Sequence, residues 1–463
     1  MKISKKMAIA AALLCSGSIF TVGTTYTRAA QSEVVDQSNM NQQIIKQVTG
    51  IADVYGDGEK IVAAILEYPN VINPRTVSTD DFKVEGKIIE AIYVNDEPKL
   101  TDRNKFGKYI ILKFKYENTA YEGDLSNRPN ANNANRHDDN KRDDNKNNGS
   151  RGTEAPMRSD RKLPDLSFSV QQCGEIEALD GTVYSANDQL VDCTSVHSPI
   201  IDSFKQFVYT DSETGLSMPY NLYLPKDYNA NKKYPLLLFI ADASANINEV
   251  TTPLFQGNGA TVFATPDEQT KHECIVLAPQ YTADLVESIG MMTTDENVWT
   301  PGLTLVTNLL FDVINNYSVD KNRIYGTGQS QGGMANIAIS DKYPDLFAAQ
   351  YLVACQWNVD EMEVLKNKKL WITVCEGDTK AFPGMNEAVA RWKSLGAKIS
   401  RNKKFWNSKA SINELNKNVK SIARKNANIN YTVFAGGNHM YTWSFAYNIE
   451  AIRDWLFAQS KDD

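Results

Sequence analysis

The fold of the larger, C-terminal part of this 463-residue chain is decided by the stretch Arg323-Ile324-Tyr325-Gly326-Thr327-Gly328-Gln329-Ser330-Gln331-Gly332. Its first half predicts a β-strand, and helical spacing begins directly after it, near Met334. A serine flanked by glycines in so tight a strand-to-helix turn is a nucleophile elbow, because side chains at positions 328 and 332 would collide there. We therefore expect Ser330 at the edge of a sheet, in front of a helix whose NH groups and positive dipole end favour developing negative charge.

Apolar strand-like runs alternate with amphipathic, helix-length segments on both sides of this elbow. This alternation is typical of a mostly parallel sheet covered by helices. The expected strands are 206–210, 220–224, 234–240, 274–278, 323–327, 348–353, 370–374 and 431–434. The expected helices are 304–317, 334–343, 386–395, 412–425 and 449–457.

A serine hydroxyl is a weak nucleophile and needs an adjacent base, for which histidine is suited. The chain contains four histidines. His137 lies in a polar stretch, His197 precedes the strands of the α/β part, and His272 lies at the wrong end of a strand. His439 follows the last expected strand through a small loop, so it emerges at the same sheet edge as the serine and is the predicted base.

The third catalytic group must be a carboxylate that orients the imidazole and stabilises its charged form. The strand Leu370–Val374 ends in Cys375-Glu376-Gly377-Asp378, and Asp378 lies just beyond its carboxyl end. We take Asp378 as the predicted acid, with Glu376 as the alternative. The chain order Ser330, Asp378, His439 is the order of the α/β-hydrolase fold.

An oxyanion hole in this fold combines the NH of the residue after the nucleophile, here Gln331, with an NH from the loop after the strand 236–240. That loop reads Ala241-Asp242-Ala243-Ser244. The NH groups of Asp242 and Ala243 are the candidates. A carboxylate at position 242 would repel an oxyanion unless it is turned away or paired.

Three tryptophans in loops after strands or beside the histidine, Trp299, Trp357 and Trp443, are candidates for a substrate-binding pocket. The alternative for each is an ordinary core position. The stretch 401–425 is basic, and we interpret it as a solvated helix face rather than as a site for an acidic partner.

The N-terminal part of the chain has a different pattern of apolar and polar residues. Residues 42–119 consist of short alternating runs with turn signals such as Gly56-Asp57-Gly58, which predicts a small all-β sandwich. Residues 120–163 are rich in Asn, Asp and Arg and lack apolar residues, so we expect a flexible linker. The α/β domain is then expected at 164–463.

Residues 1–30 have the order of a secretory signal peptide, with Lys2, Lys5 and Lys6 before an apolar run from residue 7 to about residue 22. A membrane anchor is the alternative, but the run is interrupted and is short for a span of about 20 residues. We expect an exported protein, secreted or periplasmic, without stable membrane insertion.

Export permits disulfides, and five cysteines lie beyond the signal segment. Cys173 and Cys193 flank a turn-rich stretch and are expected to pair. Cys274, Cys355 and Cys375 lie in apolar runs and are expected to be buried.

Composition excludes several classes of protein. With 42% hydrophobic and 23% charged residues the chain is an ordinary globular protein. Its net charge of −7 argues against binding of nucleic acid, which requires a basic surface. The cysteines and histidines lack zinc-site spacing, so no metal is expected, and the chemistry expected of the serine needs no cofactor.

The sequence resembles secreted bacterial esterases in which an immunoglobulin-like domain precedes an α/β-hydrolase domain of the prolyl-oligopeptidase and polyhydroxybutyrate-depolymerase type. The stretches that carry the resemblance include Tyr55-Gly56-Asp57-Gly58, Gly328–Gly333 and Gly437-Asn438-His439-Met440-Tyr441-Thr442-Trp443. The resemblance implies the same triad and a preference for carboxylic esters. Such enzymes cleave short-chain esters, feruloyl or acetyl groups on polysaccharides, or polyesters, so a small or polymer-linked ester is the expected substrate.

The expected function is that of an exported serine esterase that works through an acyl-enzyme. Two alternatives remain at this point. The same three residues also cleave peptide bonds, so the chain could be a serine peptidase of the prolyl-oligopeptidase type. It could also be a binding protein that retains the fold without catalysis.

Overall fold

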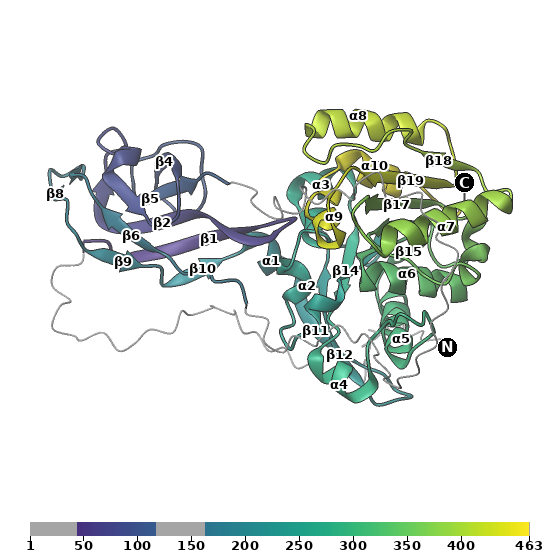
Figure 1. Ribbon diagram of the computed structural model, residues 1–463. Coiled ribbons are helices and arrows are strands. Elements are labelled where there is room, and N and C mark those ends of the chain that lie inside the picture. The colour runs from purple at the N-terminus through teal and green to yellow at the C-terminus, as the bar shows by residue number, and fades with distance from the viewer. Residues whose placement is uncertain (1–43, 117–162, 463) are drawn as a thin grey trace, which may run out of the picture.

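The computed structural model describes residues 44–116 and 163–462. A β-sandwich and a larger α/β part lie side by side (Figure 1). The predicted signal segment at 1–30, and all of the predicted linker at 120–163 except its last residue, lie outside the described residues.

The sandwich is built from two sheets. The larger sheet has the order β10-β1-β2-β5-β4, and the smaller has the order β3-β6-β9. Between the sheets lies a core that includes Val48, Leu66, Ile110 and Val170. The strands are β1 (Gln47–Tyr55), β2 (Gly58–Ile72), β3 (Phe82–Val84), β4 (Ile89–Asn95), β5 (Gly107–Phe114), β6 (Ser169–Gln172), β9 (Leu190–Asp192) and β10 (Ser195–His197), with a small pair β7 (Ile176–Glu177) and β8 (Val183–Tyr184).

The predicted start of the α/β domain at residue 164 differs from the structure. Strand β6 pairs with β3, and β10 pairs with β1, so residues 169–197 complete the sandwich. The prediction placed the boundary at the change in composition, because short alternating strands look alike before and after the polar stretch. The α/β part begins instead near α1 (Pro199–Asp202).

A nine-stranded sheet of order β11-β12-β14-β13-β15-β16-β17-β19-β18 forms the centre of the α/β part. Its strands are β11 (Lys205–Thr210), β12 (Ser217–Tyr223), β13 (Tyr234–Ile240), β14 (Ile275–Pro279), β15 (Val319–Gln329), β16 (Ala349–Val353), β17 (Leu370–Cys375), β18 (Ile399–Arg401) and β19 (Ile429–Phe434). The first three in spatial order are antiparallel, and from β14 onward neighbours are parallel. All eight predicted strands are present, and only the three-residue β18 was missed.

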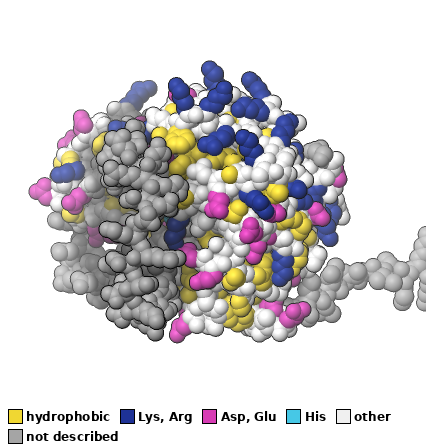
Figure 2. Space-filling model, turned by 45° about the vertical axis from the view of Figure 1, so that its right-hand side comes forward, with side chains coloured by type: hydrophobic (Ala, Val, Ile, Leu, Met, Phe, Trp, Pro, Cys, Tyr) yellow, Lys and Arg dark blue, Asp and Glu magenta, His cyan; other side chains and the backbone are white. Residues whose placement is uncertain are grey.

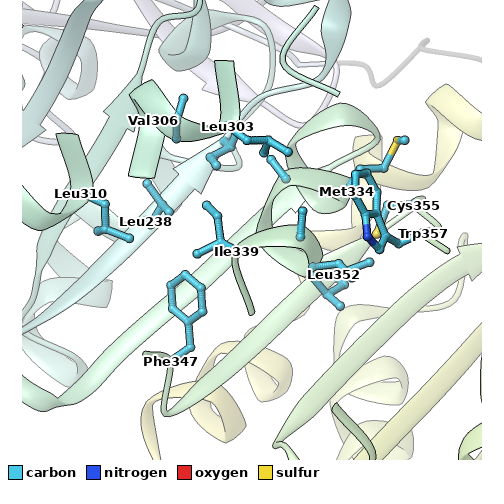
Figure 3. Packing of buried hydrophobic residues seen from close by; sticks show 14 of the residues in the cluster. Leu238, Leu303, Val306, Leu310, Met334, Ile339, Phe347, Leu352, Cys355 and Trp357 are labelled. Atoms are coloured by element: carbon cyan, nitrogen blue, oxygen red, sulfur yellow. The ribbon is translucent and has the colours of Figure 1, made fainter. Parts of the chain in front are cut away.

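Helices cover both faces of this sheet. The helices are α2 (Thr252–Phe255), α3 (Pro266–Lys271), α4 (Ala283–Ile289), α5 (Pro301–Asn316), α6 (Gln331–Lys342), α7 (Ala381–Ser394), α8 (Ile412–Ala423), α9 (His439–Ala446) and α10 (Glu450–Phe457). Alternate residues of β13 serve the two faces: Leu238 packs with α5 and α6, as Figure 3 shows, whereas Leu237 and Phe239 pack on the opposite side with α10. Because successive side chains of β13 point to opposite faces of the sheet, this buried strand contributes to the apolar layers on both faces.

The turn between β1 and β2 joins the sandwich to the α/β part, into which the two strands point in Figure 1. A Cβ atom on Gly56 would lie 1.9 Å from the carbonyl oxygen of Ser444 in α9. A Cβ atom on Gly257 would lie 3.2 Å from the carbonyl oxygen of Gly56. The turn therefore rests directly on the backbone of α9, and only a residue without a side chain fits there.

Gly56→Ala is expected to lower the melting temperature by about 2–8 °C, since forcing an extra methyl group against backbone costs about 1–3 kcal/mol. Turnover should also fall, because α9 begins at His439 and moves with the turn. Thermal melts and ester kinetics of the full chain measure both. Wild-type values for both quantities would show that the turn does not rest on α9 in solution.

Helix α6 carries a buried carboxylate near its end. Among the described residues, neither oxygen of Asp341 has a hydrogen-bond partner. Burial, together with the negative charge of Glu361, raises the pKa of Asp341 to about 8. The unfolded chain releases this proton near pH 4 and the folded protein near pH 8, so the folded state loses stability as the pH rises between these values.

Asp341→Asn is expected to remove this pH dependence. Between pH 5 and pH 8 the wild type should lose about 2–4 kcal/mol more stability than the variant, because only the wild type must ionise a buried group. Denaturant unfolding at both pH values tests this, with Asp227→Asn at an exposed position as the control. Parallel pH profiles for wild type and Asp341→Asn would contradict the assignment.

The five cysteines beyond the signal segment are all unpaired in the structure. The predicted disulfide is therefore wrong: Cys173 is exposed, whereas Cys193 belongs to the core of the sandwich and its thiol faces the carbonyl oxygen of Ser195. The spacing of the two cysteines along the chain does not reveal that one side chain is exposed and the other buried. Burial of Cys274, Cys355 and Cys375 is confirmed.

Candidate active site

Ser330 lies between β15 and α6 with a φ of +50°, which is rare for a residue with a side chain. The elbow packs on the end of β13. A Cβ atom on Gly332 would lie 1.8 Å from the carbonyl oxygen of Ile240, and one on Gly328 would lie 2.5 Å from the same atom. The glycines are required by this contact with β13 as well as by the turn itself.

Three segments bring their side chains together at the carboxyl edge of the sheet. Nε2 of His439 lies 2.8 Å from Oγ of Ser330, and Nδ1 of His439 lies 2.6 Å from Oδ2 of Asp378. The serine follows β15, the aspartate follows β17, and the histidine follows β19 and is the first residue of α9. The three residues predicted from the sequence thus form one hydrogen-bonded chain.

The surroundings of Asp378 favour its charged form. Its other oxygen, Oδ1, accepts hydrogen bonds from the NH groups of Lys380 and Ala381, at 3.0 and 2.9 Å. Burial raises the pKa of Asp378, but the hydrogen bond and charge of His439 and these two NH groups lower it, and the net pKa lies below its ordinary value. A carboxylate held ionised in this way accepts the Nδ1 proton of the imidazole and leaves Nε2 free to accept a proton from serine.

Glu376, the alternative acid, has a different position. One of its oxygens accepts a hydrogen bond of 3.1 Å from the NH of Gly436, in the loop that leads from β19 to His439. The side chain of Asn438 then caps α9 by accepting from the NH of Tyr441 at 2.9 Å. Glu376 and Asn438 therefore fix the loop on both sides of Gly437. The sequence prediction did not include the cap at Asn438, although an asparagine directly before an apolar run is a helix-start signal.

The candidate oxyanion-hole residues lie where two helices begin. Gln331 is the first residue of α6, and Ala243 is the first residue of the 3-10 helix Ala243–Ala245, which follows β13. The first NH groups of a helix have no acceptor within it, so the backbone at both positions is available to an oxyanion.

The Asp242 carboxylate is turned into a network of its own. It accepts hydrogen bonds from the NH and the hydroxyl of Ser244, at 2.8 and 2.5 Å, and from the amide groups of Gln256 and Gln329. The unusual Ala241-Asp242 sequence thus supplies a cap for the short helix, and the charge is paired rather than left facing the serine.

Of the three candidate tryptophans, only Trp443 contacts the triad. Its ring meets the His439 ring edge to face, with centroids 5.2 Å apart. Trp357 is buried in the core beside Met334 and Cys355 (Figure 3), and its indole NH donates to Glu361.

Trp299 lies away from the triad. It lines a separate cavity of 370 Å³, and its ring lies under the ammonium group of Lys342 at the far end of α6 from the nucleophile. A 12-residue helix is about 18 Å long, so Trp299 and Ser330 are widely separated. The structure therefore does not bring Trp299 to the predicted substrate pocket.

A nucleophile elbow on a mostly parallel sheet with helices on both faces defines the α/β-hydrolase fold, here preceded by a β-sandwich. The predicted fold class is confirmed. Among the described residues, no group of His, Cys, Asp and Glu side chains is suited to holding a metal ion, and no helix is long and apolar enough to cross a bilayer.

Comparisons with known proteins agree with this class. Residues 47–185 match the family of esterase Ig-like N-terminal domains. The crystal structure of a thermostable esterase is 25% identical, with a TM-score of 0.69 over 90% of this chain and 100% of that chain. No curated protein sequence matches the chain.

Other solved structures match just over half of the chain. A mutant of the feruloyl esterase module from Clostridium thermocellum, complexed with sinapinate, is 14% identical, with a TM-score of 0.39 over 56% of this chain and 90% of that chain. S-formylglutathione hydrolase from Staphylococcus aureus is 14% identical, with a TM-score of 0.33 over 55% of this chain and 98% of that chain.

The chain is an esterase, a carboxylic ester hydrolase in which an Ig-like domain precedes an α/β-hydrolase domain. The resemblance to esterases with an Ig-like domain is confirmed.

Proposed function

We propose that the chain hydrolyses carboxylic esters through Ser330, His439 and Asp378 and an acyl-enzyme. The observation that carries the proposal is the continuous hydrogen-bonded chain from Ser330 Oγ through the imidazole to Asp378. A nucleophile bonded to a base, with the base oriented by a third group, is the arrangement that activates a serine.

The reaction has two halves. Oγ of Ser330 attacks the ester carbonyl carbon while Nε2 of His439 takes the hydroxyl proton. The tetrahedral intermediate then collapses, the C–O bond to the alcohol breaks, and His439 gives its proton to the departing alkoxide. A water molecule next attacks the acyl-enzyme and passes a proton to His439, and collapse releases the carboxylic acid and returns the proton to Ser330.

The oxyanion of both tetrahedral intermediates is assigned to the NH of Gln331 together with an NH of Asp242 or Ala243. Support comes from their positions at the starts of two helices on either side of the elbow. The hydrogen bonds from Ser244 and Gln256 hold the Asp242 carboxylate in a network of its own and so reduce the repulsion that its charge exerts on an oxyanion.

The proposal includes export from the cytoplasm. It rests on the basic, apolar and small-residue order of residues 1–30. The substrate is then an ester outside the cytoplasm, either a small molecule or an ester attached to a polymer. N-terminal sequencing of the protein recovered from culture medium or a periplasmic extract is expected to start near residue 31, and a start at residue 1 would contradict export.

The chemistry is tested on the chain without residues 1–30. Its rates should be measured on p-nitrophenyl esters of increasing acyl length and on peptide p-nitroanilides, and a fluorophosphonate probe should label Ser330 in peptide mass spectra. Ester hydrolysis with label on Ser330 is the expected result. Cleavage of peptides without cleavage of esters would favour a peptidase, and absence of both activities and of label would favour a binding protein.

A further inference from the structure

A strongly basic surface of the described residues lies near the segments that carry His439. Residues 398–425 contain nine Lys and Arg and one acidic residue, in a chain with 56 acidic and 49 basic residues. All nine basic side chains are exposed. Figure 2 shows Lys and Arg gathered along the top of the molecule, where Figure 1 places α8. We name residues 398–425 the basic segment.

Helix α8 presents its charges on one face. Leu415, Val419 and Ile422 are buried on the sheet side, and the opposite side of the helix carries Lys417, Lys420 and Arg424. Helical spacing of three and four residues places these cations next to one another. The repulsion between these cations raises the free energy of the unbound protein, and a bound polyanion relieves this repulsion.

Carboxylates of the protein leave much of this surface unneutralised. Elsewhere exposed lysines pair with carboxylates, as Lys380 does with Asp295 and Lys232 with Glu273. Within residues 44–116 and 163–462, no ion pair is recorded for six cations of the basic segment, and these are Lys403, Lys404, Lys417, Lys420, Arg424 and Lys425.

The basic segment contacts the loop and the helix that carry His439. The NH of Trp406 donates to the carbonyl of Val433, and the NH of Ala435 donates to the carbonyl of Trp406, at 3.0 and 2.8 Å. The hydroxyls of Ser408 and Tyr441 are 2.8 Å apart. The segment therefore runs along the end of β19 and the start of α9, where His439 is held, and Lys403 and Lys404 lie between this contact and β18.

We propose that the basic segment binds an anionic polysaccharide, a chain of uronic acid residues that carries ester-linked acyl groups, and presents these esters to Ser330. This inference rests on the proposed esterase function and specifies its substrate class. A polymer held along α8 by its carboxylates extends past residues 403–408 toward His439. Hydrolysis of each acyl ester then follows the two half-reactions described above.

The shape of α8 favours a soluble polyanion over a membrane. A helix that lies in a lipid interface inserts its apolar face between the lipids. The apolar face of α8 is instead packed against α10 and the edge strand β18, with Leu415, Val419 and Ile422 each no more than 3% exposed. Apart from Ile412 at the first position of the helix, its exposed side chains are polar or charged, which suits a hydrated polymer of carboxylates.

The test compares one acyl group on three carriers: acetylated polygalacturonate, acetylated glucomannan, which is neutral, and p-nitrophenyl acetate. The variant is K417Q/K420Q/R424Q, which keeps good helix formers at all three positions. The control is K226Q/K321Q/K393Q, which removes three charges at exposed positions elsewhere in the α/β part.

At low salt the α8 variant is expected to raise KM for acetylated polygalacturonate about fivefold to tenfold, with kcat unchanged, because long-range attraction is lost. Its kinetics on the neutral polymer and on p-nitrophenyl acetate should equal those of wild type. The difference should disappear at about 0.5 M NaCl, where charges are screened within a few ångströms. The control variant should behave as wild type throughout.

A binding assay with an inactive variant tests the binding surface separately from the esterase reaction. In gels cast with polygalacturonate, Ser330→Ala should be retarded, and retardation should fall when the three α8 substitutions are added. Equal retardation with and without them would overturn the basic segment as the binding surface. Equally strong, α8-dependent binding to duplex DNA or to phosphatidylglycerol vesicles would overturn the polysaccharide. Failure of wild type on p-nitrophenyl acetate would overturn the esterase function itself.

Discussion

Ser330→Ala is expected to lower kcat on p-nitrophenyl esters by about a millionfold, the loss found when a triad serine is removed. The substitution deletes the attacking oxygen and leaves the elbow glycines, His439 and Asp378 in place. Residual hydrolysis should come from water activated by the imidazole and from the oxyanion NH groups, and it should lack a burst, since no acyl-enzyme forms.

The control for this experiment is Ser288→Ala, at an exposed serine of α4. Alanine also accepts a φ of +50° reluctantly, so melting curves of both variants should accompany the kinetics. A Ser330→Ala protein that is folded and retains wild-type turnover would show that another residue is the nucleophile.

Asp378→Asn is expected to lower kcat by about ten-thousandfold at neutral pH. An amide at this position donates as well as accepts, so it stabilises the tautomer with the proton on Nε2, which no longer accepts the serine proton. The lowered pKa of Asp378 means that the wild-type carboxylate stays ionised through mildly acidic pH, so protonation of this group does not account for activity lost between pH 5 and pH 7.

Glu376→Gln provides the matched comparison, because it makes the same chemical change two residues away. Its carboxylate accepts a hydrogen bond from the NH of Gly436, and an amide oxygen can accept the same bond. A loss of about tenfold or less is expected. If Glu376→Gln were the more damaging of the two substitutions, the acid would be Glu376, and the hydrogen bond between His439 and Asp378 would be structural.

The placement of the triad was predictable because its signals are local. The elbow consists of five consecutive residues. Parallel strands bring their carboxyl ends to one edge of the sheet, so residues just after β17 and β19 must lie near Ser330. His439 was found by position relative to strands, and Asp378 in the same way. Neither inference required knowledge of distant contacts.

Features that depend on packing between distant segments were not predictable. The pairing of β10 with β1 spans most of the first 200 residues, and the burial of Cys193 but not of Cys173 depends on how the ends of β9 and β6 pack in the sandwich. Trp299 and Trp357 follow strands of the sheet, yet their positions relative to the triad depend on helix length and core packing. The basic segment was interpreted as solvated because its approach to α9 is visible only in three dimensions.

Strand pairing in the sandwich also governs the order in which the chain acquires structure. Domains of a growing chain generally fold N-terminal first, as complete units emerge. Here β1 pairs with β10, and β3 pairs with β6. The sandwich is therefore complete only after residue 197 has been synthesised. Until then one edge of β1, and strand β3, lack their native partners, and the sandwich needs strands from both 44–116 and 163–197. The first domain in sequence is therefore not free to be the first to finish folding.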